Sequence, residues 1–165
     1  QTPFLFMDSI KENIILNFDT DVVHGDFRTV DFYDELLSMD KQENTTIGEK
    51  GANLSGGQKQ RLSLLRAIKS DKGCIILDEP ISAVDELTKQ NIVSSLKSLA
   101  KDKTLIISTS NPEHFLWMSD VILINEQNNS NLRTISYFKM SEALDNSDFK
   151  SLVKNRGENR GPNEN

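Results

Sequence analysis

Residues 54–61, Leu-Ser-Gly-Gly-Gln-Lys-Gln-Arg, have the composition of a helix start that can bind an anion. A helix that begins at Gly56 and Gly57 presents unpaired backbone N–H groups and the positive end of its dipole, and Ser55 adds a hydroxyl at the cap. The dipole alone favours an anion by only about 0.3–1 kcal/mol at an exposed site, so a phosphate needs further groups from elsewhere. The string therefore predicts half of a phosphate site. In a Ser-Gly-Gly sequence alone, a simple cap and a tight turn explain the same residues.

Two adjacent carboxylates end a second informative run, because residues 74–77 are apolar and Asp78, Glu79 and Pro80 follow them. Ligands of open α/β sheets bind at the carboxyl ends of the strands, where neighbouring side chains point to opposite sides. In phosphoryl transfer one carboxylate usually holds Mg²⁺, while another group orients or deprotonates the attacking water. Taken in isolation, the two acids are also explained as the end of a strand and the start of a turn at Pro80.

Together the two strings resemble the signature motif and the Walker B motif of ATP-binding-cassette (ABC) ATPases. The signature consists of Leu54, Ser55, Gly56, Gly57 and Gln58. The resemblance implies ATP and Mg²⁺ as cofactors, with Asp78 as the magnesium ligand and Glu79 as the general base. No G-x-x-x-x-G-K-[ST] phosphate loop occurs among the eight glycines. We therefore expect the C-terminal portion of a nucleotide-binding domain with the α/β fold of P-loop NTPases, including its α-helical signature subdomain.

Flanking segments extend this resemblance over residues 1 to about 153. Gln1 resembles the Q-loop glutamine, which reaches Mg²⁺ and the water, and residues 3–14 resemble the segment that faces the membrane domains in exporters. Ser82 and Asp85 lie in a segment similar to the D-loop, which runs along the partner cassette. Residues 46–61 are most similar to the first cassette of the multidrug-resistance-associated-protein (C) subfamily. The implied partners are transmembrane domains and a second nucleotide-binding domain, whose ATP the signature contacts in trans.

One catalytic position departs from the family pattern. After the apolar strand that ends at Thr109, the family has a histidine that contacts the γ-phosphate, whereas this chain has Ser110. A hydroxyl cannot act as a cationic clamp, so we expect the site that uses this chain's own carboxylates to hydrolyse ATP slowly or only to hold it. An offset alignment would give that role to His114, but residues 107–110 fit the pattern without a gap. We interpret His114 and His24 as ordinary surface residues.

Hydrophobic spacing predicts the elements that position these residues. Helices are expected near residues 8–16, 27–39, 55–72, 84–99, 112–118, 141–144 and 148–153, and strands near 74–78, 104–109, 121–125 and 134–138. The alternation of strands and helices from residue 74 to 125 predicts a mostly parallel sheet with helices on both sides. Continuous apolar runs in its strands predict burial on both faces, Cys74 included.

The predicted organisation is a partial nucleotide-binding domain at residues 1–153, with a helical subdomain at about 8–72 and part of the ATPase core at 73–153. Residues 154–165 are rich in glycine and asparagine, which predicts a disordered tail or linker. A formal net charge of −6 argues against nucleic acid as a partner. No apolar run is long enough to span a membrane, so we expect the chain itself to be soluble, although the resemblance implies the cytosolic face of a membrane.

The leading interpretation is part of the first nucleotide-binding domain of an ABC exporter, which couples ATP binding and hydrolysis to transmembrane transport. The resemblance places the phosphate loop and the front strands of the core upstream of Gln1. We therefore expect the isolated chain to bind ATP weakly, to be inactive, and to dimerise through exposed apolar faces.

Two other classes stay open. A soluble ABC ATPase of the DNA-repair or translation type would bring coiled-coil insertions or basic linkers, and neither appears in the sequence. The other class is a degenerate regulatory cassette, in which ATP binding acts as the gate and ATP hydrolysis is minor. Ser110 favours this class, whereas Glu79 opposes it.

Overall fold

The computed structural model describes residues 3–16, 20–126 and 133–154. The chain divides into two compact units, Gln1–Thr109 and Ser110–Asn165. The predicted Q-loop residue Gln1 and the predicted tail from residue 155 onward lie outside the described residues. The expected division into 8–72 and 73–153 stays a prediction.

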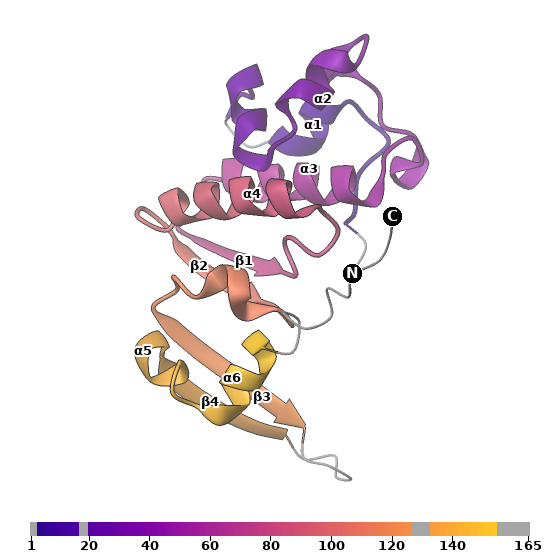
Figure 1. Cartoon of the computed structure of the whole chain (residues 1–165). Coiled ribbons are helices and arrows are strands. Elements are labelled where there is room, and N and C mark those ends of the chain that lie inside the picture. The colour runs from indigo at the N-terminus through magenta and orange to yellow at the C-terminus, as the bar shows by residue number, and fades with distance from the viewer. Residues whose placement is uncertain (1–2, 17–19, 127–132, 155–165) are drawn as a thin grey trace. The chain divides into compact units, whose positions relative to one another are not determined.

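Short helices, two long helices and a pair of strands form the first unit. In chain order these are α1 (Ile10–Ile15), η1 (His24–Val30), α2 (Tyr33–Ser38), η2 (Gln42–Asn44), η3 (Glu49–Gly51), α3 (Gly56–Lys69), β1 (Cys74–Asp78), α4 (Glu86–Leu99) and β2 (Thr104–Ser108), where η marks a 3₁₀ helix. The predicted parallel pairing of β1 with β2 is confirmed, with Asp78 opposite Ser108. The helices α3 and α4 lie on one side of this pair (Figure 1). The carboxyl ends of both strands therefore meet at one edge.

Both long helices bury one apolar face. Leu62 and Leu65 on α3, and Ile92 and Leu96 on α4, have 0% of their surface exposed. These residues recur three or four positions apart, which places them on one side of each helix. Phe27 and Phe32, from the segment around η1, are equally buried. This core fixes α3, whose first residues are the candidate anion site.

The predicted single helix over residues 27–39 is wrong, because the chain forms two elements there. Asp31 ends η1 with a left-handed backbone at φ 56°. Asp is one of the few residues that adopt this conformation readily, because its short polar side chain finds local partners. The side chain of Asp31 accepts hydrogen bonds from Thr88 and Asn91, so contacts with α4 stabilise the break.

The prediction that the strands are buried on both faces is also wrong. Ile75 and Leu77 of β1 are only 4% and 6% exposed, whereas Ile76 is 74% exposed and Cys74 is exposed as well. On β2, Ile106 is 51% exposed. The physical reason is that, among the described residues of the first unit, the long helices α3 and α4 lie on one side of the pair. The expected exposure of an apolar sheet face is thereby confirmed.

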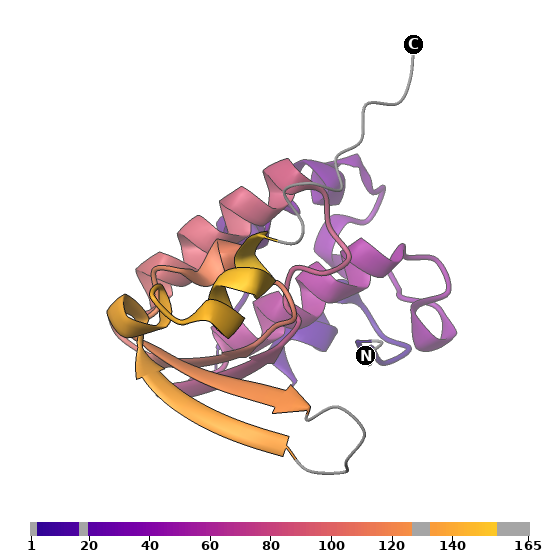
Figure 2. The same cartoon turned by 60° about the horizontal axis from the view of Figure 1, so that its bottom comes forward.

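The second unit contains an antiparallel strand pair and short helices. Its elements are η4 (Pro112–Phe115), β3 (Asp120–Glu126), β4 (Arg133–Lys139), α5 (Met140–Ala143) and α6 (Ser147–Lys154). The two long arrows of β3 and β4 run side by side in opposite directions (Figure 2), with Ile122 opposite Tyr137. Residues 121–125 were expected as a third parallel strand, but among the described residues they pair with β4. Strands that follow one another closely in sequence commonly pair in this antiparallel way.

Candidate functional site

The start of α3 has the geometry of a capping box. The Ser55 hydroxyl accepts a hydrogen bond from the Gln58 backbone N–H at 3.2 Å, and the Gln58 side chain accepts one from the Ser55 N–H at 2.8 Å. Leu54, just before the cap, is 9% exposed and anchors the chain to the core, whereas Ser55 and Gly56 are exposed. The cap thus holds the positive end of a 14-residue helix open to solvent.

The two glycines of this helix start differ in what surrounds them. A Cβ added at Gly57 would lie 2.7 Å from the carbonyl oxygen of Ala83, so the absence of a side chain allows α3 to approach the backbone of the 79–83 turn. A Cβ added at Gly56 would meet nothing within 4 Å. The fold of this chain therefore explains Gly57, whereas the open space beside Gly56 is available to a group outside the chain.

The two candidate carboxylates lie at the carboxyl edge of β1 and β2. The hydroxyl of Ser108 donates a hydrogen bond to Asp78 Oδ1 across the strand pair. The backbone N–H of Glu79 donates to the carbonyl of Ser108 at 2.9 Å, and Thr109 Oγ1 donates to Glu79 Oε2 at 3.3 Å. The backbone of Glu79 is left-handed, with φ 46°. The second strand thus orients both acids.

The donor set fits a magnesium ion that is bound together with a phosphate. Mg²⁺ is usually held in nucleotide sites by one or two carboxylates, with phosphate oxygens and waters as the remaining ligands. Asp78 offers one exposed carboxylate at the strand end, next to the half-buried Glu79. Asp78 therefore supplies the one carboxylate that such a site needs at minimum.

The segment after these acids begins α4. Asp85 caps this helix, because its Oδ1 accepts a hydrogen bond from the Thr88 N–H at 3.1 Å. Hydrogen bonds from the backbone and the side chain of Thr88 hold the pKa of Asp85 below its usual range. The hydroxyl of Ser82 donates to the carbonyl of Glu79 at 3.1 Å. Both predicted D-loop residues are exposed, and both also stabilise local structure.

The remaining predicted positions are Ser110 and the two histidines. Ser110 is exposed and is the first residue of the second unit. His114 lies on η4, where its carbonyl accepts a hydrogen bond from the Trp117 indole N–H. His24 pairs with Glu43 at 2.6 Å and is half-buried, so it is a structural partner within the helical segment.

Comparisons with known proteins decide the family. A family model described as ABC transporter matches residues 1–82. ABC transporter C family member 2 of Dictyostelium discoideum is 36% identical over 160 residues, which are 94% of this chain and 11% of that protein. The chain is part of an ABC transporter nucleotide-binding domain. The multidrug resistance-like ATP-binding protein MdlA of Escherichia coli (strain K12) is 35% identical over 127 residues, 75% of this chain and 22% of that protein.

A solved structure supports the fold of this nucleotide-binding domain. The structure of a bacterial Atm1-family ABC exporter with ATP bound matches with a TM-score of 0.79 at 22% identity, covering 92% of this chain and 27% of that one. The chain thus spans between a tenth and about a quarter of the length of the relatives it matches. No helix within residues 3–16, 20–126 and 133–154 combines the length and the apolar character needed to cross a bilayer.

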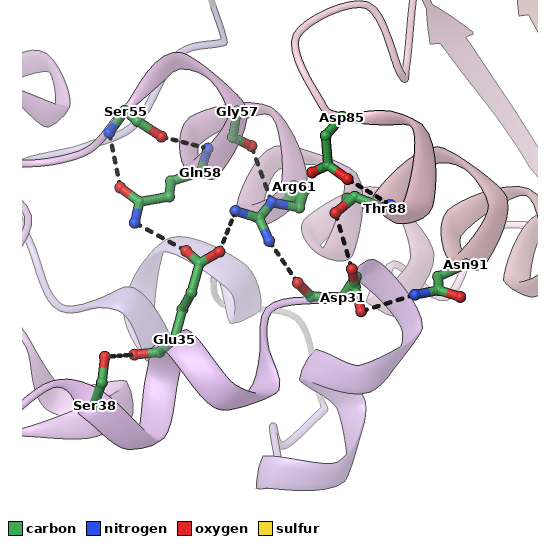
Figure 3. A network of polar contacts seen from close by, with 10 residues as sticks. All are labelled: Asp31, Glu35, Ser38, Ser55, Gly57, Gln58, Arg61, Asp85, Thr88 and Asn91. Carbon is green, nitrogen blue, oxygen red and sulfur yellow. Dashed lines mark hydrogen bonds and ion pairs between the residues drawn. The ribbon is translucent and has the colours of Figure 1, made fainter. Parts of the chain in front are cut away.

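A polar network behind the signature of the nucleotide-binding domain was not predicted from the sequence (Figure 3). The Glu35 carboxylate accepts hydrogen bonds from Gln58 Nε2 at 2.9 Å and from Arg61 at 2.6 Å. Arg61 is only 8% exposed, and it also donates to the carbonyls of Asp31 and Gly57. The network therefore ties α2 to the start of α3.

The same network continues to α4. Asp31 accepts hydrogen bonds from Thr88 Oγ1 at 2.9 Å and from Asn91 Nδ2 at 3.1 Å, while its carbonyl binds Arg61. Thr88 in turn donates its N–H to Asp85, the cap of α4. Asp31 thus joins the signature helix to the helix that begins at the candidate D-loop (Figure 3).

Proposed function

We propose that this chain is part of the first nucleotide-binding domain of an ABC exporter of the multidrug-resistance-associated-protein (C) subfamily. In this proposal ATP binding and hydrolysis at the cytosolic face of a membrane drive transport through transmembrane domains. Support comes from the C-family relative in Dictyostelium and from the multidrug resistance-like relative in E. coli. The observation that carries the proposal is the exposed capped start of α3, with open space beside Gly56.

The signature acts in trans on ATP held by a second nucleotide-binding domain. Ser55 and the first-turn N–H groups bind the terminal phosphate, and the helix dipole adds a favourable field. The Glu35–Gln58 hydrogen bond holds the Gln58 side chain against the capping box, which keeps the amides in position. This preorganisation is the usual source of electrostatic stabilisation in phosphoryl transfer.

At the chain's own nucleotide site, Asp78 and Gln1 would hold a magnesium ion, which would neutralise charge on the phosphates when bound. Glu79 accepts a proton from the attacking water as the general base. Ser110 replaces the expected cationic residue, so hydrolysis at this site is slow compared with hydrolysis at the site completed by the signature.

Gly56→Ala tests the trans role of the signature in the full-length transporter. The added methyl group fits within this chain and improves helix propensity by about 1 kcal/mol, so the fold is not weakened. We expect ATP turnover of the transporter to fall by about 10²-fold, because the methyl group occupies the space for the partner's phosphate. The matched control is Gly73→Ala, where an added Cβ also meets nothing within 4 Å and turnover stays at the wild-type level. Wild-type turnover in Gly56→Ala would contradict the proposal.

Ser110 favours a second candidate function, a regulatory site at which ATP binds and is scarcely hydrolysed. Under that alternative Glu79→Gln leaves turnover of the transporter unchanged. A clear fall in turnover for Glu79→Gln, together with a gain for Ser110→His, supports hydrolysis at this site instead.

A further inference from the structure

The side chain of Gln60, in the second turn of α3, reaches the turn that carries the second acid. Its Nε2 donates hydrogen bonds to the carbonyl of Glu79 at 2.6 Å and to Ser82 Oγ at 3.1 Å. Its Oε1 accepts a hydrogen bond from the Ala83 backbone N–H at 2.9 Å. The side-chain amide of Gln60 therefore forms hydrogen bonds with both the first and the last residue of the 79–83 turn.

The backbone of Glu79 is the part of this turn that most requires support. Its φ of 46° is left-handed, a conformation that costs energy in a residue other than glycine. The N–H of Glu79 is bound by the carbonyl of Ser108, and its carbonyl is bound by Gln60 and Ser82. Since the peptide groups on both sides of Glu79 are held, the direction in which its Cα–Cβ bond leaves the backbone is held as well.

The helix that carries Gln60 also lies directly against this turn. An added Cβ at Gly57 would approach the Ala83 carbonyl oxygen to 2.7 Å, which leaves no room for a side chain between α3 and the turn. A movement of α3 is therefore transmitted to residues 79–83 through contact and through the Gln60 amide.

We propose that Gln60 is a positioning residue, which holds the 79–83 turn on the signature helix and so aims the Glu79 carboxylate at the attacking water. The inference rests on the proposed function, in which Glu79 is the general base. It links the signature, which serves the partner's ATP, to the carboxylate that serves the ATP bound by this chain. Only a side chain with a donor and an acceptor at this length makes both contacts.

Two isosteric variants in the full-length transporter test the hold on the turn. Gln60→Met removes the donor and the acceptor, whereas Gln60→Glu keeps the acceptor for the Ala83 N–H and loses the donor to Glu79. In hydrogen-exchange mass spectrometry, the backbone amides of Glu79 and of residues 81–83 should exchange faster in Gln60→Met, and less so in Gln60→Glu. Ser63→Ala, one turn further along α3, is the control and should keep wild-type exchange. Unchanged exchange in Gln60→Met overturns the proposal.

Turnover measurements on the same variants test the catalytic consequence. The test is made in a transporter whose second nucleotide-binding domain lacks its own general base, so that only the site of this chain turns over. In that background Gln60→Met should lower kcat for ATP by about 10- to 100-fold with little change in KM, because a misaimed base slows chemistry and leaves nucleotide binding intact. In Gln60→Glu the introduced carboxyl regains a donor when it is protonated, so its kcat relative to wild type should rise as the pH falls. A purely structural role would not produce this pH dependence.

Glu79→Gln separates failure of this inference from failure of the proposed function. If, in the same background, Glu79→Gln abolishes turnover and Gln60→Met keeps the kcat of the unsubstituted protein, the positioning role is overturned while the proposed function stands. If Glu79→Gln leaves turnover unchanged, catalysis by this chain's own carboxylates is overturned, and the exchange data alone then decide whether Gln60 holds the turn.

Discussion

At the scale of single residues, a few polar side chains stabilise the described part of the first unit. Some support a left-handed backbone conformation, and others compensate a buried charge. Arg61 is the clearest case, since its guanidinium is almost fully buried and is satisfied by Glu35 and by backbone carbonyls. A buried charge is tolerated only when its partners satisfy it. Glu35 therefore compensates the buried charge on α3.

Removing the Glu35 carboxylate should destabilise the fold measurably. Glu35→Ala leaves Arg61 buried without its ion-pair partner, and we expect a loss of about 1–3 kcal/mol in the free energy of unfolding. The value is below that for a fully buried pair because the Glu35 side chain is 39% exposed. Urea unfolding followed by circular dichroism measures the change. Asp21→Ala, which breaks an exposed pair with Lys11, is the control and should show almost no effect; equal losses in the two variants would contradict the argument.

At the scale of elements, side-chain caps set where the helices begin. Ser9, Ser55 and Asp85 each accept a hydrogen bond from the N–H three residues later, at 3.1, 3.2 and 3.1 Å respectively. The sequence pattern predicted a cap at Asp8 or Ser9, and the structure confirms Ser9. It placed the start of α4 at Val84, two residues before the observed start at Glu86, because apolar spacing locates a helix face better than its first residue.

The cap at Asp85 should make α4 sensitive to acid. The folded-state pKa of Asp85 lies below its ordinary value of 3.8, so the ionised cap stabilises the fold above that value and the contribution disappears as the pH falls through the folded-state pKa. Asp85→Asn keeps a capping oxygen that does not titrate. We expect the Tm of the wild type to fall more steeply than that of Asp85→Asn below pH of about 4. Parallel Tm curves for the two proteins would rule out this contribution.

At the scale of the whole molecule, each unit leaves one apolar sheet surface exposed. On the β1–β2 pair this surface includes Ile76 and Ile106. On the β3–β4 pair it includes Ile122 and Ile124, with Ile135 and Tyr137 on the opposite strand. Contiguous exposed apolar surface of this kind commonly marks an interface or a site of aggregation.

The exposed β1–β2 surface should make the isolated chain self-associate. Replacing both Ile76 and Ile106 by Thr keeps strand propensity and lowers the apolar area, so the double variant should shift toward monomer. Sedimentation velocity over a range of concentrations measures this shift. Leu87→Thr is the control, since Leu87 is 68% exposed on α4 and away from the strand surface. A wild-type chain that stays monomeric at every concentration would contradict the prediction.

The sequence by itself determined the family, the helix start at Ser55 and the strand that ends at Asp78, because these depend on local spacing and on motifs of adjacent residues. Tertiary structure alone decided which distant side chains support them. Glu35 and Arg61 are 26 residues apart, and Gln60 and Glu79 are 19 apart, so no local pattern indicates either contact. The break at Asp31 and the exposed face of β1 were mispredicted for the same physical reason: hydrophobic periodicity records which residues are apolar, whereas burial and backbone breaks depend on the elements that pack against them.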